Sequence, residues 1–442
     1  MWIAWVVGLR AVGDNSFLWH VRAGTAQLDL GRVFTTDPFS FTSPGDAWRT
    51  QSWLAELGYG FLENLTGGIG WVHLLLFAVV SLTLVAVGMA VYGTTHRIAP
   101  TAVAMLVVAW QGAPFAVPRP VIFSYLALAI VVLVLQRSDA DLWVLPPLIW
   151  AWAAVHGSFV LGIGVIVLDA VRGRSKQRAG TALAAVVLAT MTAHGVGVWR
   201  ILVDFLGARG ALDLITEWQS PDFSSPFVVP YAIGLAGLLV ASASGKISRR
   251  DLVLLGPFAF FGMLANRNLY PALIVLAPHA SLALVTEREP RRRDDSQIVN
   301  WAFVTVMVGF ALLGLARDVE LDENRFPDAA ALEAVEDGAP LFHGTAVGGY
   351  LIYAEWPERL VFIDDRAELF GEEGFRTFHD VRLACGRPAD CVGGEGYREV
   401  FERLSIRQAL LEPEWPIVGA LTDDGWVERY RDAHFVVMAA TG

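Results

Sequence analysis

Residues 70–92 read GWVHLLLFAVVSLTLVAVGMAVY and contain no Asp, Glu, Lys or Arg. An apolar run of about 20 residues is long enough to cross the hydrocarbon core of a bilayer as one helix. Shorter runs of the same kind fill most of residues 1–316, and 55% of the whole 442-residue chain is hydrophobic. The sequence therefore predicts a polytopic α-helical membrane protein.

We expect about eleven membrane spans. Several of the apolar runs are shorter than the roughly 20 residues that a full crossing needs, so this count is approximate. The segments are 2–12, 70–92, 98–112, 121–136, 142–155, 157–170, 180–194, 227–244, 252–266, 270–285 and 300–316.

The charge of the chain changes near position 317. Residues 1–316 carry 21 Lys and Arg against 18 Asp and Glu, whereas residues 317–442 carry 12 against 26. This asymmetry predicts a transmembrane domain over 1–316, with a long first outer loop at 13–67, followed by a small soluble α/β domain over 317–442. No segment is basic enough to predict a nucleic-acid partner.

Alternating helix and strand patterns in the C-terminal region predict a layered sheet domain. We expect helices at 326–337, 371–383 and 395–404, and strands at 340–343, 360–363, 407–411 and 432–438. Cys385 and Cys391 lie in this region. Two free thiols and a small disulfide loop are both compatible with their spacing.

The loops predict the orientation of the chain in the membrane. With the N-terminus in the cytoplasm, the inner loops hold 13 Lys and Arg in 39 residues and the outer loops hold 7 in about 100. Positive residues stay on the cytoplasmic side of membranes. This places the C-terminal domain outside the cytoplasm. It also favours a break between 142–155 and 157–170, because one long helix there would move the basic residues of 171–178 to the outer face.

Ionisable side chains gather at the predicted outer ends of the spans. Charged groups at the membrane boundary usually line a water-filled cavity or site, although some only anchor helices at the interface. Carboxylates can act as general bases or hold a divalent cation, Arg can pair with phosphate, and His can shuttle protons. Such a set suits transfer of a group from a lipid phosphate. The residues are Asp14, His20, Asp37, Glu56, Arg119, His156, His194, Glu217 and Arg267.

Several stretches resemble bacterial GT-C-type membrane glycosyltransferases. The first outer loop carries DNSFLWHVRAG (14–24), TDPFSFTSPGDAW (36–48) and QSWLAEL (51–57). Shorter similarities follow at RP (119–120), HGSF (156–159), TEWQSPDF (216–223) and RN (267–268). GGYLIY (348–353) and VFIDDRAELF (361–370) resemble the soluble domain of one branch of these proteins.

The resemblance implies a GT-C-like fold and a hexosyl- or pentosyltransferase. Its donor would be a polyprenyl-phosphate-linked sugar, used at the outer face of the bacterial cytoplasmic (inner) membrane, and its acceptor a glycan, lipid or protein of the cell envelope. In such proteins a catalytic acid follows the first span, and this position matches Asp14. Asp37 would support it. The remaining residues, His20, Glu56, Arg119, His156, His194, Glu217 and Arg267, would bind substrate.

Two departures from the family leave other readings open. Relatives often carry a second acid two residues after the first and an Asn two residues before the His-Gly pair. This chain has Ser16 and Ala154 there. A divalent cation such as Mg or Mn would then need Asp37, or no metal would be used. The alternatives are a non-catalytic scaffold or transport component of envelope polysaccharide assembly, and a secondary transporter.

Overall fold

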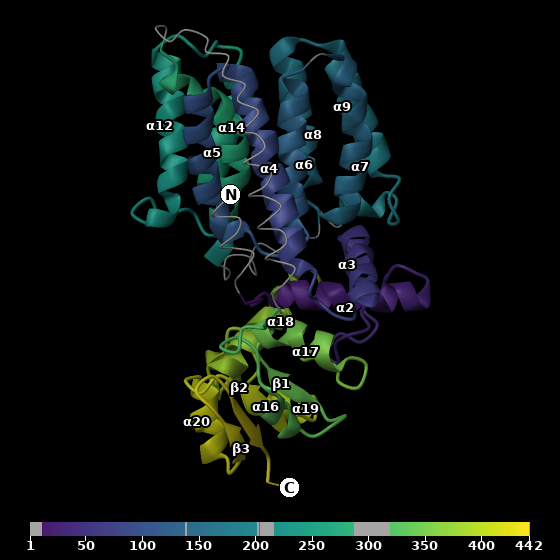
Figure 1. The fold of residues 1–442 in the computed structure, drawn as a ribbon. Helices are drawn as coiled ribbons and strands as arrows, with labels where there is room; N and C mark the ends of the chain where they lie inside the picture. Colours follow the sequence, from purple (N-terminus) through teal and green to yellow (C-terminus); the bar gives the residue numbers. More distant parts are fainter. Residues whose placement is uncertain (1–10, 138, 201–202, 204–215, 287–318, 442) are drawn as a thin grey trace. The chain divides into compact units, whose positions relative to one another are not determined.

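The computed structural model describes residues 11–137, 139–200, 203, 216–286 and 319–441. Their contacts form two compact units (Figure 1). The helical unit comprises Thr66–Trp199 and the described part of Ile215–Val319. The mixed unit comprises Ala11–Leu65 and the described part of Glu320–Gly442. The predicted first outer loop therefore packs with the C-terminal residues.

The helical unit is built from the apolar runs of the sequence. Its α-helices are α4 (Val72–Thr95), α5 (Ile98–Gly112), α6 (Val121–Leu135), α7 (Leu145–Val155), α8 (Phe159–Gly173), α9 (Lys176–Ala189), α12 (Val229–Ala243), α13 (Leu252–Leu264) and α14 (Leu269–Ala280). Short 3-10 helices are η1 (Ala113–Phe115), η2 (Asp139–Val144), η3 (Thr216–Trp218), η4 (Pro226–Val228), η5 (Asn266–Asn268) and η6 (Ser281–Leu284). Helix α4 packs on α5 and α6, α7 packs on α9, and α12 packs on α14 (Figure 1).

Three helical segments in the described residues are long and apolar enough to cross a membrane. They are Val72–Thr95, Ile98–Phe115 and Pro226–Ala243. Val121–Leu135 and Leu252–Leu264 are apolar but shorter. Apart from positions 11 and 12, the predicted spans 2–12 and 300–316 lie outside the described residues. The structure thus supports a membrane unit of apolar helices and does not establish eleven spans.

The predicted break between 142–155 and 157–170 is confirmed. Helix α7 ends at Val155, where His156 has an extended backbone (φ −164°, ψ 141°), and α8 begins at Phe159. The backbone N–H of His156 still bonds to the carbonyl of Trp152, at 2.8 Å. The chain therefore turns between two separate helices at the His156-Gly157 pair.

The mixed unit contains a four-stranded sheet. Its strands are β1 (Leu341–His343), β2 (Gln408–Leu411), β3 (Val427–Arg431) and β4 (Val436–Ala439), in the order β1-β2-β4-β3. Strand β1 is parallel to β2, and the other neighbours are antiparallel. The helices are α2 (Asn15–Leu30), α3 (Trp53–Thr66), α16 (Ala329–Glu333), α17 (Thr345–Glu355), α18 (Ala367–Arg382), η7 (Pro388–Asp390), α19 (Tyr397–Arg403) and α20 (Pro416–Asp423).

The two faces of this sheet bury different partners. Side chains alternate between the faces of a strand, so Leu341 and Phe342 enter different cores. Leu341 joins a core with Trp19, Phe39 and Trp48 of the first loop. Phe342 lies in the other core with residues of α18, α19 and α20. One face of the C-terminal sheet is therefore covered partly by α16 and α17 and partly by first-loop residues that precede it by about 300 positions.

Helices α2 and α3 cross at two glycines. A Cβ atom built on Gly24 would lie 1.8 Å from the carbonyl oxygen of Glu56, and one on Gly60 would lie 2.3 Å from the carbonyl carbon of Gly24. Only glycine permits backbones to approach this closely. The crossing brings the middle of α2 against the start of α3, which is where His20 and Glu56 lie.

Several predicted C-terminal elements need correction. The predicted strand at 360–363 does not join the sheet. Instead Val361 forms a single bridge with Ser40, because its backbone bonds to Phe39 and Phe41 of the first loop. Helices α17 and α20 and the edge strand β3 were not predicted. The predicted helix at 326–337 is only five residues long, as α16.

Candidate functional site

Asp14 is the N-cap of α2. Its carboxylate accepts a hydrogen bond from the backbone N–H of Phe17, with Oδ1 3.0 Å from the nitrogen. A cap of this kind satisfies one of the free N–H groups at a helix start, and the positive end of the helix dipole favours its charge. The half-buried carboxylate is thus fixed to the first turn of α2. Its assignment as a base stays a prediction.

His20 and Glu56 form the centre of a buried polar cluster. Nδ1 of His20 lies 2.9 Å from Oε1 of Glu56, whose side chain is completely buried. Gln27 donates to Oε2 of Glu56 at 2.7 Å, and the Thr50 hydroxyl donates to Oε1. A buried carboxylate is tolerated when such donors surround it. The structure therefore brings two of the predicted substrate-binding residues into direct contact.

The charge of Asp14 also acts on Tyr59, which lies near Glu56. Burial raises the pKa of Tyr59 well above its usual range, and the negative charges of Asp14 and Glu56 raise it further. Tyr59 also contacts Phe17 edge to face, with 5.6 Å between ring centroids. The start of α2 and the His20–Glu56 cluster are consequently parts of one electrostatic neighbourhood.

Asp37 belongs to a buried ion-pair network with the C-terminal residues. Oδ1 of Asp37 lies 2.6 Å from Nη1 of Arg366, and both side chains are fully buried. Arg366 also binds Asp364 through Nε and Nη2, at 2.6–2.9 Å. The second carboxylate oxygen of Asp37 accepts from the backbone and hydroxyl of Ser40. Asp37 is therefore placed to fix the first loop to the C-terminal domain.

The network perturbs the charges of its members. Burial lowers the pKa of Arg366, but the carboxylates of Asp364 and Asp37 outweigh it and raise the pKa above its usual range. Burial raises the pKa of Asp364, and Arg366 opposes this rise. The Trp48 ring lies 4.5 Å from the Arg366 guanidinium. Removing one partner of such a network leaves an uncompensated buried charge.

In the helical unit, Arg119, Glu217 and Arg267 share one electrostatic environment. The Arg267 guanidinium lies over the ring of Trp218, 4.1 Å from its centroid. Burial lowers the pKa of Arg267, and the positive charge of Arg119 lowers it further, while Tyr125 and Glu217 oppose this. A backbone bond of 2.9 Å from Asn266 to Gln219 holds η3 beside η5. The charges of Arg119 and Glu217 therefore both act on the Arg267 guanidinium.

The two predicted histidines of this unit occupy turns between helices. Nδ1 of His156 lies 2.8 Å from the Ser158 hydroxyl and accepts from the backbone N–H of Ser158 at 3.2 Å. The carbonyl of His194 accepts from the backbone N–H of Gly197 at 2.9 Å. Both side chains are half-buried. Their assignment to substrate binding stays a prediction.

The described residues contain no group of three or more His, Cys, Asp or Glu side chains that could hold a metal ion. The site predicted from sequence included Mg or Mn as a candidate cofactor, with Asp37 as a candidate ligand. Because Asp37 is engaged by Arg366 and Ser40, we assign no step of the reaction to a metal.

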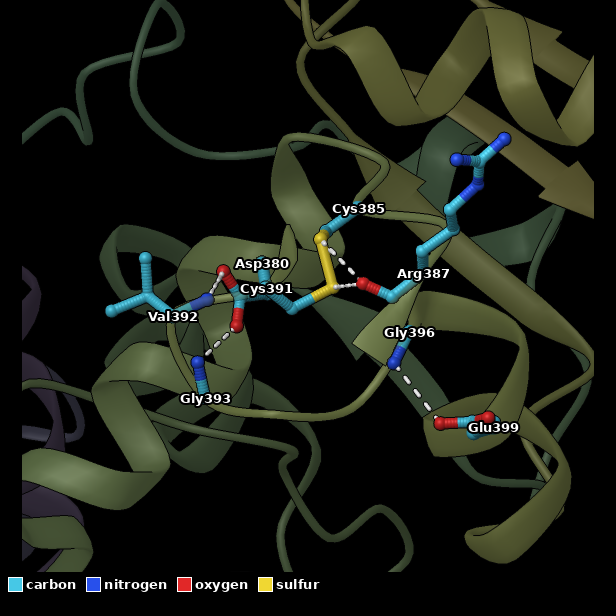
Figure 2. The surroundings of a disulfide bond; sticks show 8 residues. All are labelled: Asp380, Cys385, Arg387, Cys391, Val392, Gly393, Gly396 and Glu399. Carbon is cyan, nitrogen blue, oxygen red and sulfur yellow. Dashed lines mark hydrogen bonds between the residues drawn. A yellow bond between two sulfur atoms is a disulfide. The ribbon is translucent and has the colours of Figure 1, made fainter. Parts of the chain in front are cut away.

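Cys385 and Cys391 form a disulfide, with 5.7 Å between their Cα atoms (Figure 2). The loop that it closes is also held by the Asp380 carboxylate, which accepts from the backbone N–H groups of Val392 and Gly393 (Figure 2). Disulfides persist mainly in oxidising compartments. Of the two states that the sequence left open, the structure contains the disulfide.

Two partners of the site were not predicted. The first is Arg366, which binds Asp37 from 329 residues away. The second is Trp218, whose ring lies under the Arg267 guanidinium. A Trp next to Glu217 is a weak signal, because interfacial Trp residues occur in any membrane protein.

Solved structures share this architecture. The chain is similar to the Archaeoglobus fulgidus oligosaccharyltransferase in its apo form, with TM-score 0.56 and 10% identity over 93% of this chain and 69% of that one. It is also similar to ArnT from Cupriavidus metallidurans bound to undecaprenyl phosphate, with TM-score 0.50 and 14% identity over 99% and 96%. The predicted resemblance is confirmed at the level of fold. The chain has a GT-C fold.

Other structures with this GT-C fold contain ligands. The archaeal protein, AglB, is similar to this chain also in complex with an inhibitory peptide and a dolichol-phosphate, with TM-score 0.55 and 11% identity over 93% and 68%. No protein-family model matches the sequence, and no curated protein does. At these identities the likeness concerns the fold alone.

Proposed function

We propose that this chain is a membrane glycosyltransferase. It would move a hexose or pentose from a polyprenyl-phosphate carrier to a glycan, lipid or protein acceptor at the outer face of the bacterial cytoplasmic membrane. The fold supports this class, since AglB and ArnT are described with dolichol-phosphate and undecaprenyl phosphate respectively. The basic residues of the predicted inner loops and the C-terminal disulfide support the orientation.

The arginine pair is the observation that carries the proposal. Arg119 and Arg267 lie at the ends of apolar helices and their charges act on each other. Guanidinium is the side chain best matched to phosphate, and the Arg267 guanidinium is held over the Trp218 ring, 4.1 Å from its centroid. A lipid phosphate is therefore the ligand class that this environment suits best.

The proposed reaction is an in-line displacement at the sugar. The acceptor hydroxyl oxygen attacks the anomeric carbon and forms the new glycosidic bond. The bond from the anomeric carbon to the phosphate oxygen breaks, and its electron pair leaves with the polyprenyl phosphate. Asp14 accepts the proton of the acceptor hydroxyl, and Arg119 and Arg267 stabilise the charge that develops on the phosphate.

The other predicted residues take supporting roles in this proposal. Asp37 acts through Arg366, as a positioning residue that holds the first loop. Glu56 orients His20, because a carboxylate bonded to Nδ1 fixes the ring and its tautomer. We keep His156 and His194 as substrate-binding residues at helix turns.

The arginine assignment can be tested with undecaprenyl phosphate as the probe. Arg119 precedes α6 and Arg137 follows it, so the two lie at opposite ends of one 15-residue helix. We expect undecaprenyl phosphate to raise the melting temperature of the detergent-purified parent and of Arg137→Gln. For Arg119→Gln and Arg267→Gln, we expect the undecaprenyl phosphate concentration that gives half of this rise to be at least about tenfold higher. Equal stabilisation of all four proteins would contradict the proposed phosphate site.

The proposed sugar transfer is tested with a set of lipid-linked donors. Purified parent protein would be given undecaprenyl-phosphate-linked hexoses and pentoses together with glycan, lipid and peptide acceptors. The release of undecaprenyl phosphate and the glycosylated acceptor would both be measured. Release with one donor supports the transferase. Binding of undecaprenyl phosphate without release from any donor favours the non-catalytic scaffold of envelope assembly. The capping role of Asp14 and the engagement of Asp37 by Arg366 are the observations that favour this second function.

A further inference from the structure

The first turn of α2 contacts residues of the C-terminal domain. The Asn15 side chain donates to the carbonyl of Thr345 at 3.0 Å. Helix α17 approaches so closely that a Cβ atom on Gly349 would lie 2.2 Å from the carbonyl oxygen of Asn15. The same turn carries Asp14 as its cap. The position of Asp14 is therefore set by contacts that the C-terminal domain makes with the residues next to it.

Asp365 makes the most specific of these contacts. Its Oδ2 accepts from the hydroxyl of Ser16, and its Oδ1 accepts from Nε1 of Trp19 at 2.9 Å. Positions 16 and 19 are three apart and so lie on one face of the helix. One carboxylate thus bridges the first turn of α2 to the second.

The residues on either side hold Asp365 in place. Asp364 and Arg366 are fully buried and bind each other, and Arg366 binds Asp37. The Asp365 carboxylate therefore extends from a segment that is anchored on both sides. A side chain fixed in this way can determine the position of a helix, rather than follow it.

We propose that Asp365 is a positioning residue for Asp14. Asp365 fixes Ser16 and Trp19, these fix the first turn of α2, and the cap bond to Phe17 fixes the Asp14 carboxylate on that turn. The inference rests on the proposed function in one respect, which is that Asp14 is the base. Misplacement of a reacting group by about 1 Å can cost about 100-fold in rate.

Two substitutions separate positioning from direct chemistry. Asp365→Asn removes the charge but keeps one acceptor for Trp19 and gains a donor that can bond to the Ser16 oxygen. Asp365→Ala removes both contacts. We expect kcat to fall about 30- to 100-fold in Asp365→Ala, with KM for the donor within about threefold. We expect Asp365→Asn to stay within about threefold of the parent. An equal loss in both variants would overturn positioning, since it would assign the charge itself to the reaction.

A double-mutant cycle tests the path through Ser16. If Asp365 acts through this contact, the losses of kcat in Ser16→Ala and Asp365→Ala should not be additive. The double variant should then be no slower than Asp365→Ala. Additive losses would show that the two residues act separately. Asp424→Ala is the matched control. Asp424 lies in the same domain, and in the described contacts its carboxylate binds the exposed Arg398 and the hydroxyl of the buried Tyr397.

Amide hydrogen exchange gives a readout that needs no substrate. In the purified full-length chain we expect peptides covering 15–22 to exchange faster in Asp365→Ala than in the parent, in Asp365→Asn and in Asp424→Ala. Unchanged exchange in Asp365→Ala overturns the inference whatever the activity. Faster exchange with full turnover also overturns it, because the helix would then be displaced without consequence. If the parent releases no undecaprenyl phosphate from any donor, the proposed function fails, and exchange alone still decides whether Asp365 holds α2.

Discussion

The carboxylate of Asp14 is used in two ways, one observed and one proposed. The observed use is the cap bond to the Phe17 N–H, at 3.0 Å. The proposed use is to accept a proton from the acceptor hydroxyl. Both can operate together, because a carboxylate has two oxygens with about four acceptor positions. The two uses are separable by substitution, since capping needs an acceptor oxygen and base catalysis needs a group that takes up a proton.

Asp14→Asn should keep the cap and lose the base. Asn and Asp are equally good N-caps, so we expect the melting temperature to stay close to that of the parent. We expect turnover to fall on the order of 100- to 10,000-fold, as is typical when a positioned base is removed. Asp29→Asn, at the exposed far end of α2, is the control and should retain turnover. An Asp14→Asn protein as fast as the parent would make Asp14 a cap alone.

His343 predicts how stability depends on pH. Its ring is fully buried, with Nδ1 bonded to the carbonyl of Gly344 at 3.0 Å and Nε2 accepting from the Phe362 N–H at 2.9 Å. Burial lowers the pKa of His343 to about 4. Between pH 6.5 and 4 the unfolded state therefore binds more protons than the folded state, so stability falls as pH falls through this window.

We expect the lowered pKa of His343 to reduce the free energy of unfolding by about 2 kcal/mol when the pH falls from 7 to 5. Denaturant midpoints at the two pH values measure this loss. The exposed His434 supplies a control, because His434→Gln should show the same loss as the parent. His343→Gln has no ring to protonate and should lose less. A parent with equal stability at both pH values would contradict the buried neutral ring.

At the scale of elements, the α2–α3 crossing depends on glycine. Gly24→Ala and Gly60→Ala each place a methyl group into backbone atoms of the facing helix, and we expect a loss of stability of about 1–3 kcal/mol. Gly58 lies on the same helix as Gly60, is exposed, and has open space around its Cβ position. Gly58→Ala should therefore be neutral or slightly stabilising. Thermal unfolding of the three variants tests this contrast, and equal losses would argue against the close crossing.

Local pattern allowed some elements to be predicted and concealed others. The apolar runs predicted the helices of the helical unit, and the basic loop at 171–178 predicted the break at His156. Helix α17 was missed because Gly348 and Gly349 are poor helix formers. The structure shows why glycine is present there, since both positions pack closely against backbone atoms of other segments. The predicted strand at 360–363 was wrong because its partner is the first loop. Pattern within a short window cannot show such a partner.

The sequence could select candidate residues for the site but could not indicate how they are arranged. Position at span ends selected both Asp14 and Arg267. Nothing in the sequence indicated that Asp37 would bind Arg366 or that His20 would bind Glu56. These contacts depend on tertiary packing between segments 36 to 329 residues apart. Composition and loop charge carry no information about such pairs.

For the whole molecule, the sign of the loop charges predicts a testable orientation. We expect a phosphatase that is active only outside the cytoplasm to be active when fused after Gly442 and inactive when fused at Arg292, because the inner loops hold most of the basic residues. Fluorescence of a fused green fluorescent protein gives the opposite readout and serves as the control. A reversed pattern would place the C-terminal domain in the cytoplasm and would contradict the proposed reaction at the outer face.

The union of the first loop with the C-terminal domain also has a consequence for biosynthesis. Asp37 leaves the ribosome 329 residues before Arg366. At 5–20 residues per second, this interval is about 15–65 s. During that time the aromatic side chains of α2 and the 34–48 segment lack the sheet that later covers them, and Asp37 lacks its cation. The mixed unit therefore completes its folding only after Arg366 has left the ribosome, and nascent chains stalled before Arg366 should be preferred substrates of quality-control proteases.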